Sequence, residues 1–154
     1  MKRISILAVT ILVTGVLASC AGTGAAASPQ FAEKFIAAEG KAWSSGDVLD
    51  LKALEDVDVI YHLPDADVKG WDAHEKYILE GRKTVSDLRQ EWKYLSGEKN
   101  HMILSYSSSA VISGKDESKT AVSNNYLFAF RLENGKIKEV WTNGSTVSKP
   151  EASK

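Results

Sequence analysis

The stretch NNYLFAFRLENGKIKEVWTNGSTV, from Asn124 to Val147, decides the fold of this chain. Two runs rich in β-branched and aromatic residues flank Asn134-Gly135, a dipeptide that favours a two-residue hairpin turn because both turn positions need positive φ. A two-residue loop fixes the register of the two strands, and alternation then puts every second pair on one face. The pairs predicted for that face are Leu132 with Ile137, Phe130 with Glu139, Phe128 with Trp141, Tyr126 with Asn143 and Asn124 with Ser145.

The face that carries these pairs is the better candidate for the core, because it holds most of the aromatic rings. Leu127, Ala129 and Val140 then fall on the opposite face. A carboxylate and several amides share the aromatic face, and this mixture suits a pocket for a ligand with an apolar body and a polar tip. The alternative is that Glu139 lies at the rim of the sheet, in water.

The first twenty residues predict export. Lys2 and Arg3 precede an apolar run, residues 4–17, that is shorter than the about 20 residues a membrane-spanning helix needs. The sequence Leu17-Ala18-Ser19-Cys20 resembles a bacterial lipobox, which implies cleavage before Cys20 and a lipid such as palmitate on that residue. The alternative is an accidental or buried cysteine in an uncleaved anchor.

This resemblance implies a lipoprotein signal peptide over residues 1–19, a lipidated Cys20 with a tether over residues 20–28, and a membrane-anchored location in the cell envelope, outside the cytoplasm. The chain has one cysteine, so it forms no disulfide within itself. Residues 29–148 are long enough for one domain with a single core, and residues 149–154 are expected to be disordered. A net charge of −1 without a basic stripe argues against nucleic acid as a partner.

Hydrophobic periodicity and turn residues predict helices first and hairpins last. Such segregation indicates the α+β class. The expected helices run from Pro29 to about Ser44, over 48–54, from Trp71 to about Leu79 and from Thr84 to about Leu95. The expected strands cover residues 57–63, 102–112, 119–132 and 136–147.

The runs AWSSGDVLDLKALEDVDVIYHLP, VKGWDAHEKYI and YLFAFRLENGKIKEVWT together resemble the SnoaL-like branch of the nuclear transport factor 2-like superfamily. This resemblance implies a cystatin-like cone, in which a curved antiparallel sheet wraps around the N-terminal helices and leaves a pocket at its mouth. The family contains polyketide cyclases and isomerases, and more distantly dehydratases and epoxide hydrolases. Its cyclases use an acidic residue a few positions past the last-strand tryptophan. No carboxylate follows Trp141 up to Val147, so whether this chain is an enzyme stays open.

The register and the family fold together predict one site at the open end of the cone. His62 and Glu139 are its candidate catalytic residues, because a histidine titrates near neutral pH and a buried carboxylate can exchange protons. Tyr61 and His62 are neighbours on one strand, so their side chains are expected on opposite faces. The candidate ligand-binding residues are Tyr61, His62, Trp71, Tyr126, Phe128, Glu139, Trp141 and Asn143.

No cofactor or metal is expected. The acidic stretch that begins at Asp65 partly matches a calcium-binding loop, but it has Lys69 and Lys76 at positions where oxygen ligands are required. Three functions remain open: a lipid-anchored domain that binds a small, mostly apolar molecule, an acid–base enzyme of the cyclase or ketosteroid isomerase kind, and a homodimeric interaction module that uses Leu127, Ala129 and Val140.

Overall fold

The computed structural model describes residues 27–114 and 118–150. The chain order in this part is α1 (Pro29–Ser45), α2 (Leu49–Leu54), β1 (Glu55–His62), β2 (Asp67–Lys69), α3 (Trp71–Thr84), β3 (Val85–Glu98), β4 (His101–Ser113), β5 (Lys119–Glu133) and β6 (Lys136–Pro150). Helices precede the long hairpins, so the predicted α+β class is confirmed.

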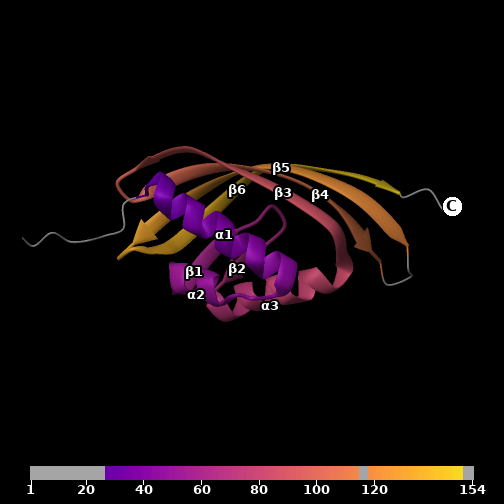
Figure 1. Ribbon diagram of the computed structural model, residues 1–154, viewed down its shortest axis with the longest axis horizontal. Coiled ribbons are helices and arrows are strands. Elements are labelled where there is room, and N and C mark those ends of the chain that lie inside the picture. The colour runs from indigo at the N-terminus through magenta and orange to yellow at the C-terminus, as the bar shows by residue number, and fades with distance from the viewer. Residues whose placement is uncertain (1–26, 115–117, 151–154) are drawn as a thin grey trace, which may run out of the picture.

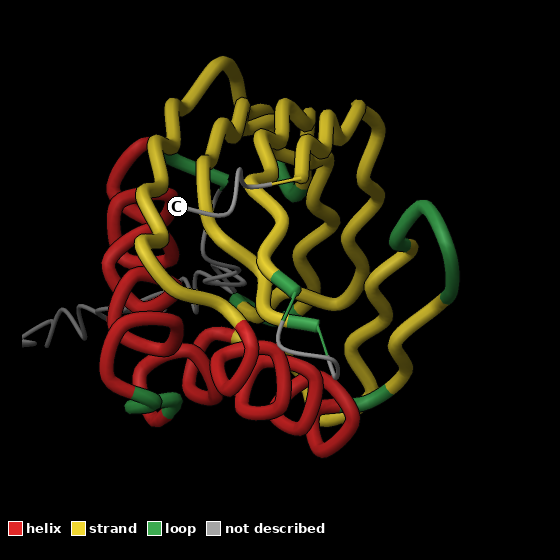
Figure 2. The backbone as a smooth tube through the Cα atoms, turned by 90° about the vertical axis from the view of Figure 1, so that its right-hand side faces the viewer, coloured by secondary structure: helices red, strands yellow, loops and turns green. Residues whose placement is uncertain are grey.

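One curved sheet organises the domain, with the strand order β2-β1-β6-β5-β4-β3. Neighbouring strands are antiparallel except β1 and β6, which run parallel, so the sheet is mixed rather than wholly antiparallel. The four long strands arch over α1, while α2 and α3 lie below it at the bottom of the view (Figure 1). Turned by 90°, the helices run along one side and the base of the curved sheet (Figure 2). We call the concave side, which faces the helices, the inner face, and the convex side the outer face.

Helix α1 has the boundaries that its end residues predict. The Ser28 hydroxyl accepts a hydrogen bond from the Phe31 amide at 3.2 Å, Pro29 occupies the first turn, and Gly46 closes the helix at φ 81°. Its apolar stripe, which includes Phe35 and Ala38, is buried against the inner face. Phe35 contacts Phe130 of β5 edge-on, with ring centroids 4.9 Å apart, so this helix and the sheet share one core.

The hairpin between β5 and β6 turns where predicted, but its register is different. Asn134 and Gly135 both have positive φ, and Leu132 faces Ile137 as expected. Beyond this pair a bulge at Lys138 shifts the ladder by one residue.

The shift reverses the faces of β6, because side chains alternate along a strand. Phe130 faces Val140 and Phe128 faces Thr142 on the inner face, instead of Glu139 and Trp141. The predicted register beyond Leu132 was therefore wrong. Val140 lies in the core, and Trp141 lies on the outer face, where Val140 was expected.

The helix predicted from Thr84 to about Leu95 is also wrong, because this segment is strand β3, paired along its length with β4. Its inward residues alternate as Leu88, Gln90, Trp92 and Tyr94, while Leu95 is exposed. Bulges near both ends of this run break the alternation, and Asp87 has φ 51° at the first of them. The broken alternation imitates helical spacing.

Both chain ends differ from the expected boundaries. Ala27, placed in the predicted tether, is buried and its amide donates to the Lys99 carbonyl at 2.9 Å. Strand β6 continues through Pro150, so residues 149 and 150 of the predicted disordered tail are paired with β5. The predicted signal peptide and Cys20 lie outside the described residues. In the part of the chain that the structure describes, no helix is long and apolar enough to cross a membrane.

Candidate functional site

A pocket of about 560 Å³ opens between the inner face of the sheet, helices α1 and α3, and the loop that joins β1 to β2. This volume is typical of sites for small molecules, which occupy about 300–1,000 Å³. The pocket is lined by residues of three kinds: aromatic rings (Trp43, Tyr61, Tyr77, Trp92, Tyr106, Tyr126, Phe128), apolar side chains and loop residues (Leu63, Pro64, Ala66, Val68, Val85, Leu88, Ala110, Ile112, Val122), and polar or charged groups (Glu39, Asp65, His74, Gln90, Ser108, Asn124, Thr142, Thr146).

A buried polar cluster lies where α1, β1 and α3 meet. Both carboxylate oxygens of Glu55 are occupied: Oε1 accepts from the Tyr61 hydroxyl at 2.6 Å, and Oε2 lies 3.0 Å from Nδ1 of His74. The His74 ring stacks on Tyr61 with centroids 3.9 Å apart. Glu39 lies beside them on α1 with 6% of its surface exposed, and its Oε2 has no hydrogen-bond partner.

The cluster holds two carboxylates, and only Glu55 is fully satisfied. Burial raises the pKa of Glu39 from 4.5 to about 7, and the Glu55 charge adds to the rise while His74 and a hydrogen bond from Trp43 oppose it. Glu39 therefore exchanges its proton near neutral pH. Burial, with the nearby charges of Glu55 and Glu39, also raises the pKa of Tyr61 well above its ordinary value, so this hydroxyl stays protonated and donates.

Aromatic rings form the opposite wall. Trp92 of β3 contacts Tyr106 of β4 and Phe128 of β5 at centroid distances of 4.3 and 4.9 Å, and Tyr126 packs 6.3 Å from Phe128. Nε1 of Trp92 is buried and has no partner. This wall offers a broad apolar surface with one unused hydrogen-bond donor.

Small polar groups on β3 to β6 complete the wall. The Asn124 amide donates to the Ser108 hydroxyl at 2.9 Å, and the Thr146 hydroxyl donates to Oδ1 of Asn124 at 2.7 Å. Gln90 donates to the Tyr106 hydroxyl at 3.3 Å. These groups satisfy one another, so Glu39 and Trp92 are the lining residues whose buried side-chain atoms lack partners among the described residues.

The structure brings together only part of the predicted site. Tyr61, Tyr126 and Phe128 line the pocket. Trp71 does not line it: its ring is buried in the core, edge-on to His74 at 6.2 Å. The predicted convergence of His62, Trp71, Tyr126, Glu139, Trp141 and Asn143 at one mouth was therefore wrong, because only Tyr126 of these lines the pocket.

The remaining four predicted residues lie on the outer face, because the Lys138 bulge reverses β6 and His62 alternates with Tyr61. Those residues are His62, Glu139, Trp141 and Asn143. The expectation that Tyr61 and His62 point to opposite faces is confirmed. Whether any of the predicted residues binds a ligand or takes part in catalysis stays a prediction.

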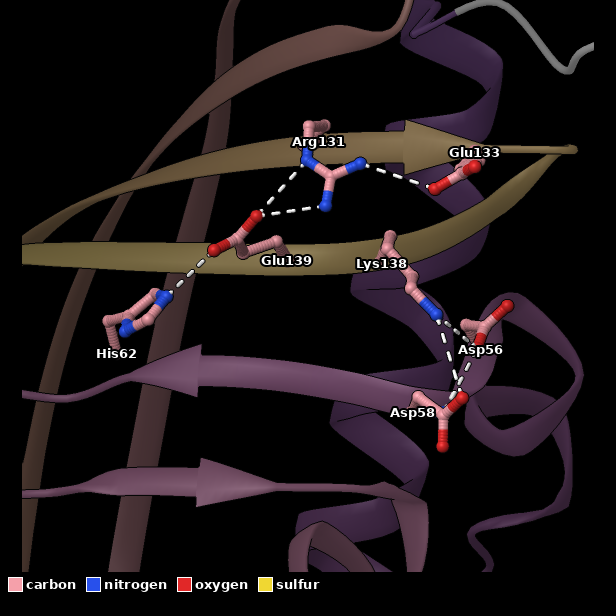
Figure 3. A network of polar contacts seen from close by, with 7 residues as sticks. All are labelled: Asp56, Asp58, His62, Arg131, Glu133, Lys138 and Glu139. Atoms are coloured by element: carbon pink, nitrogen blue, oxygen red, sulfur yellow. Dashed lines mark hydrogen bonds and ion pairs between the residues drawn. The ribbon is translucent and has the colours of Figure 1, made fainter.

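The outer-face residues form an ionic network of their own (Figure 3). Glu139 accepts from Nε and Nη2 of Arg131 at 3.1 and 2.9 Å, and its other oxygen lies 3.0 Å from Nε2 of His62. Nδ1 of His62 lies 2.9 Å from Asp67, and its ring stacks on Trp141. Both ring nitrogens of His62 thus face carboxylates, away from the pocket.

Sequence reasoning missed Glu39, Glu55 and the role of His74. A signal for Glu39 existed, because it falls on the apolar stripe of α1, four residues after Phe35 and three before Ala42. His74 is buried on α3, with 4% of its surface exposed. Its pairing with Glu55 joins the start of β1 to α3, and no local pattern announces such a contact.

A family model described as a SnoaL-like domain matches residues 32–140. No curated protein matches the chain significantly. Solved structures of similar fold include an NTF2-like protein from Burkholderia xenovorans LB400 (14% identity, 75% of this chain and 87% of that chain, TM-score 0.59) and an LEH-like epoxide hydrolase from M. tuberculosis (12%, 75% and 80%, 0.57). A third is a protein with a ketosteroid isomerase-like fold from Catenulispora acidiphila DSM 44928, in complex with trimethylamine (13%, 75% and 85%, 0.59). These likenesses confirm the predicted nuclear transport factor 2-like fold.

Proposed function

The chain belongs to the SnoaL-like domain family, and we propose that its inner pocket binds a small, mostly apolar molecule that carries a polar group. One observation carries this proposal. The pocket has aromatic walls, and Oε2 of Glu39 and Nε1 of Trp92, both buried on lining residues, have no partner. A buried polar group without a partner costs roughly 1–3 kcal/mol, so a ligand that pairs with either atom gains this energy in addition to its apolar contacts.

The similar structures do not identify the class of ligand that this pocket binds. The similar structures include an epoxide hydrolase and a protein that holds trimethylamine, yet at 12% and 13% identity they show the fold alone. The walls favour an apolar body, because their rings present a wide hydrophobic surface that the polar groups of β4 to β6 interrupt at one side.

A pair of substitutions on neighbouring residues of β4 tests the pocket. Ala110 lines it, whereas Ser109 is exposed on the outer face. In titrations with the neutral dye Nile red, we expect Ala110→Phe to weaken binding at least about tenfold, equivalent to about 1.4 kcal/mol. Ser109→Phe should leave the affinity unchanged. Equal affinities in the two variants, or no binding by the wild type, would reject the pocket as the site.

An acid–base enzyme is a second candidate function. In such an enzyme Glu39 is a better candidate for the general base than the predicted pair of His62 and Glu139. Glu39 lies in the pocket, and its pKa of about 7 suits a general base near neutral pH. A base of this kind would remove a proton from the carbon beside a carbonyl. NMR of 4-phenylbutan-2-one in D₂O measures this directly, and faster deuterium uptake with the wild type than with Glu39→Gln is the expected result. Identical rates would remove this candidate.

The lipid anchor and the homodimer also stay proposals. The lipobox-like Leu17-Ala18-Ser19-Cys20 supports lipidation, and it lies outside the described residues. Cys20→Ala should abolish incorporation of labelled palmitate in cells. A homodimer through the outer face would use Leu127 and Trp141, both partly exposed there, instead of the buried Val140. Sedimentation of the wild type and of Leu127→Glu would show whether this face joins two chains.

A further inference from the structure

The charges around the pocket are unbalanced. Two carboxylates, Glu39 and Glu55, are buried in the cluster with a single imidazole, that of His74. That imidazole is hydrogen-bonded to Glu55 at 3.0 Å, so an ionised Glu39 has no basic side chain as an ion-pair partner among the described residues. Burying such a charge without a partner is costly, so the site favours a positive group next to Oε2 of Glu39.

The rest of the lining adds to the same sign of charge. Asp65 lies at the exposed rim, and no lysine or arginine is found among the described residues that line the pocket. The lining also holds tyrosine hydroxyls from β1, α3, β4 and β5 (Tyr61, Tyr77, Tyr106, Tyr126). Burial raises the pKa of Tyr61, Tyr77 and Tyr106, which keeps these three hydroxyls neutral near pH 7. An anionic ligand would meet repulsion from Glu39 and Asp65 without a fixed cation to offset it.

The walls suit a cation as well as an apolar body. Trp43 and Tyr77 pack edge to face at 6.3 Å on the side of Glu39, and Trp92 stands among the rings of the opposite wall. Aromatic faces attract ammonium groups, tryptophan most strongly. A carboxylate with one unpaired oxygen beside such rings suits the recognition of organic ammonium ions.

We propose that the pocket takes an amphipathic organic amine, with its ammonium group at the carboxylate of Glu39 and its apolar body against the aromatic wall. This inference rests on the proposed binding of a small, mostly apolar molecule and names its chemical class. It assigns Glu39 as the residue that discriminates by charge and the rings as the surface that binds the body.

Three probes of one shape separate charge from apolar contact. They are 3-phenylpropylamine, which is a cation near neutral pH, the neutral 3-phenylpropan-1-ol, and the anion 3-phenylpropanoate. Calorimetry with the purified full chain at pH 8 should give at least about tenfold tighter binding of the amine than of the alcohol, since a hydrogen bond between two charged groups is stronger than one to a neutral hydroxyl. The propanoate should bind most weakly.

Two substitutions on α1 provide the variant and its control. Glu39→Gln should bring the affinity for the amine down to within about twofold of that for the alcohol, and leave the alcohol unaffected. Glu33→Gln makes the same change on the exposed side of the helix and should leave all three affinities as in the wild type. The pH adds a readout that a structural role would not move. The amine-to-alcohol ratio should rise from pH 6 to pH 8 in the wild type, as Glu39 ionises, and stay flat in Glu39→Gln.

The outcomes separate the two proposals. If the alcohol binds and the amine binds no better, or if Glu39→Gln retains the preference for the amine, the assignment of an amine is overturned while the apolar pocket stands. If none of the three probes binds the wild type, the amine assignment falls together with the proposed binding function.

Discussion

Glu139 of β6 accepts two hydrogen bonds from the guanidinium of Arg131 on β5, directly across the ladder. The turn at Asn134-Gly135 alone would pair Arg131 with Lys138 and bring like charges together on one face. The bulge places Glu139 opposite Arg131 instead, and Nζ of Lys138 reaches Asp56 at 2.9 Å (Figure 3). Arg131 and Lys138 thus each pair with a carboxylate, Glu139 and Asp56 respectively, and these pairs favour the shifted register.

The shifted register predicts unequal costs for removing two large side chains of the hairpin. Phe130 is fully buried, so Phe130→Ala should lower the free energy of unfolding by roughly 3–5 kcal/mol. Trp141 is 39% exposed and stacks on His62, so Trp141→Ala should cost about 1 kcal/mol. Urea denaturation measures both changes. A loss of 3 kcal/mol or more for Trp141→Ala would restore the unshifted register.

The fold could be predicted because its signals are local and repeat each other. The turn at Asn134-Gly135, the cap at Ser28 and the apolar stripe of α1 each agree with the fold that the structure shows. The site could not be predicted to the same depth, because it depends on bulges. One extra residue at Lys138 places Val140 on the inner face instead of Glu139. The bulge near Asp87 gives the apolar residues of β3 the spacing of a helix, so this strand was predicted as a helix.

The pairing of Glu55 with His74 shows the other limit. It joins residues 19 positions apart, from the start of β1 and from α3, and neither local sequence contains the partner. Glu39 was the more accessible clue, because a carboxylate on an apolar stripe indicates either a partner or a ligand.

His62 should titrate above the ordinary value for histidine. The hydrogen bond with Glu139 raises its pKa most, burial opposes the rise, and Asp67 adds to it. In Glu139→Gln the pKa of His62 should fall, and NMR of the imidazole protons against pH measures the change. Glu133→Gln is a matched control, because Glu133 pairs with Arg131 and has no contact with His62 among the described interactions. An unchanged His62 pKa in Glu139→Gln would mean that the ring does not hold this carboxylate.

The pH dependence of folding stability follows from the direction of this pKa shift. A histidine with a raised pKa contributes stability that is fully present below the pKa of the unfolded chain and is lost as the pH rises through the folded value. Glu139, whose pKa is lowered by His62 first and then by Arg131, contributes stability at higher pH that is lost as the pH falls through its folded value. His62→Gln should therefore destabilise the domain more at pH 5.5 than at pH 8, in urea titrations at the two pH values. An equal loss at both pH values would contradict the pairing.

Tyr61 and Tyr126 test the two ends of the pocket. Tyr61→Phe removes the donor to Oε1 of a fully buried carboxylate, so it should cost about 1.5–3 kcal/mol of stability. Tyr126→Phe removes a bond to the exposed Thr146 hydroxyl and should cost within about 0.5 kcal/mol. Thermal or urea unfolding compares them. Similar small losses would show that the hydrogen bond from Tyr61 to Glu55 does not stabilise the fold.

Glu39 makes the strongest prediction on stability, because its pKa of about 7 in the folded chain lies well above its ordinary value of 4.5. A carboxyl with a raised pKa binds more protons folded than unfolded, so its contribution to stability falls as the pH rises between the two values. The fall amounts to about 3 kcal/mol, since one pKa unit corresponds to about 1.4 kcal/mol.

Glutamine cannot ionise, so the stability of Glu39→Gln relative to the wild type should rise by about 3 kcal/mol from pH 4 to pH 8. Urea unfolding of both proteins across this range measures the difference, and Glu33→Gln should show no such trend. A flat difference for Glu39→Gln would mean that the carboxylate finds a cation or water in the folded protein, and the case for a charge-selective pocket would lose its electrostatic basis.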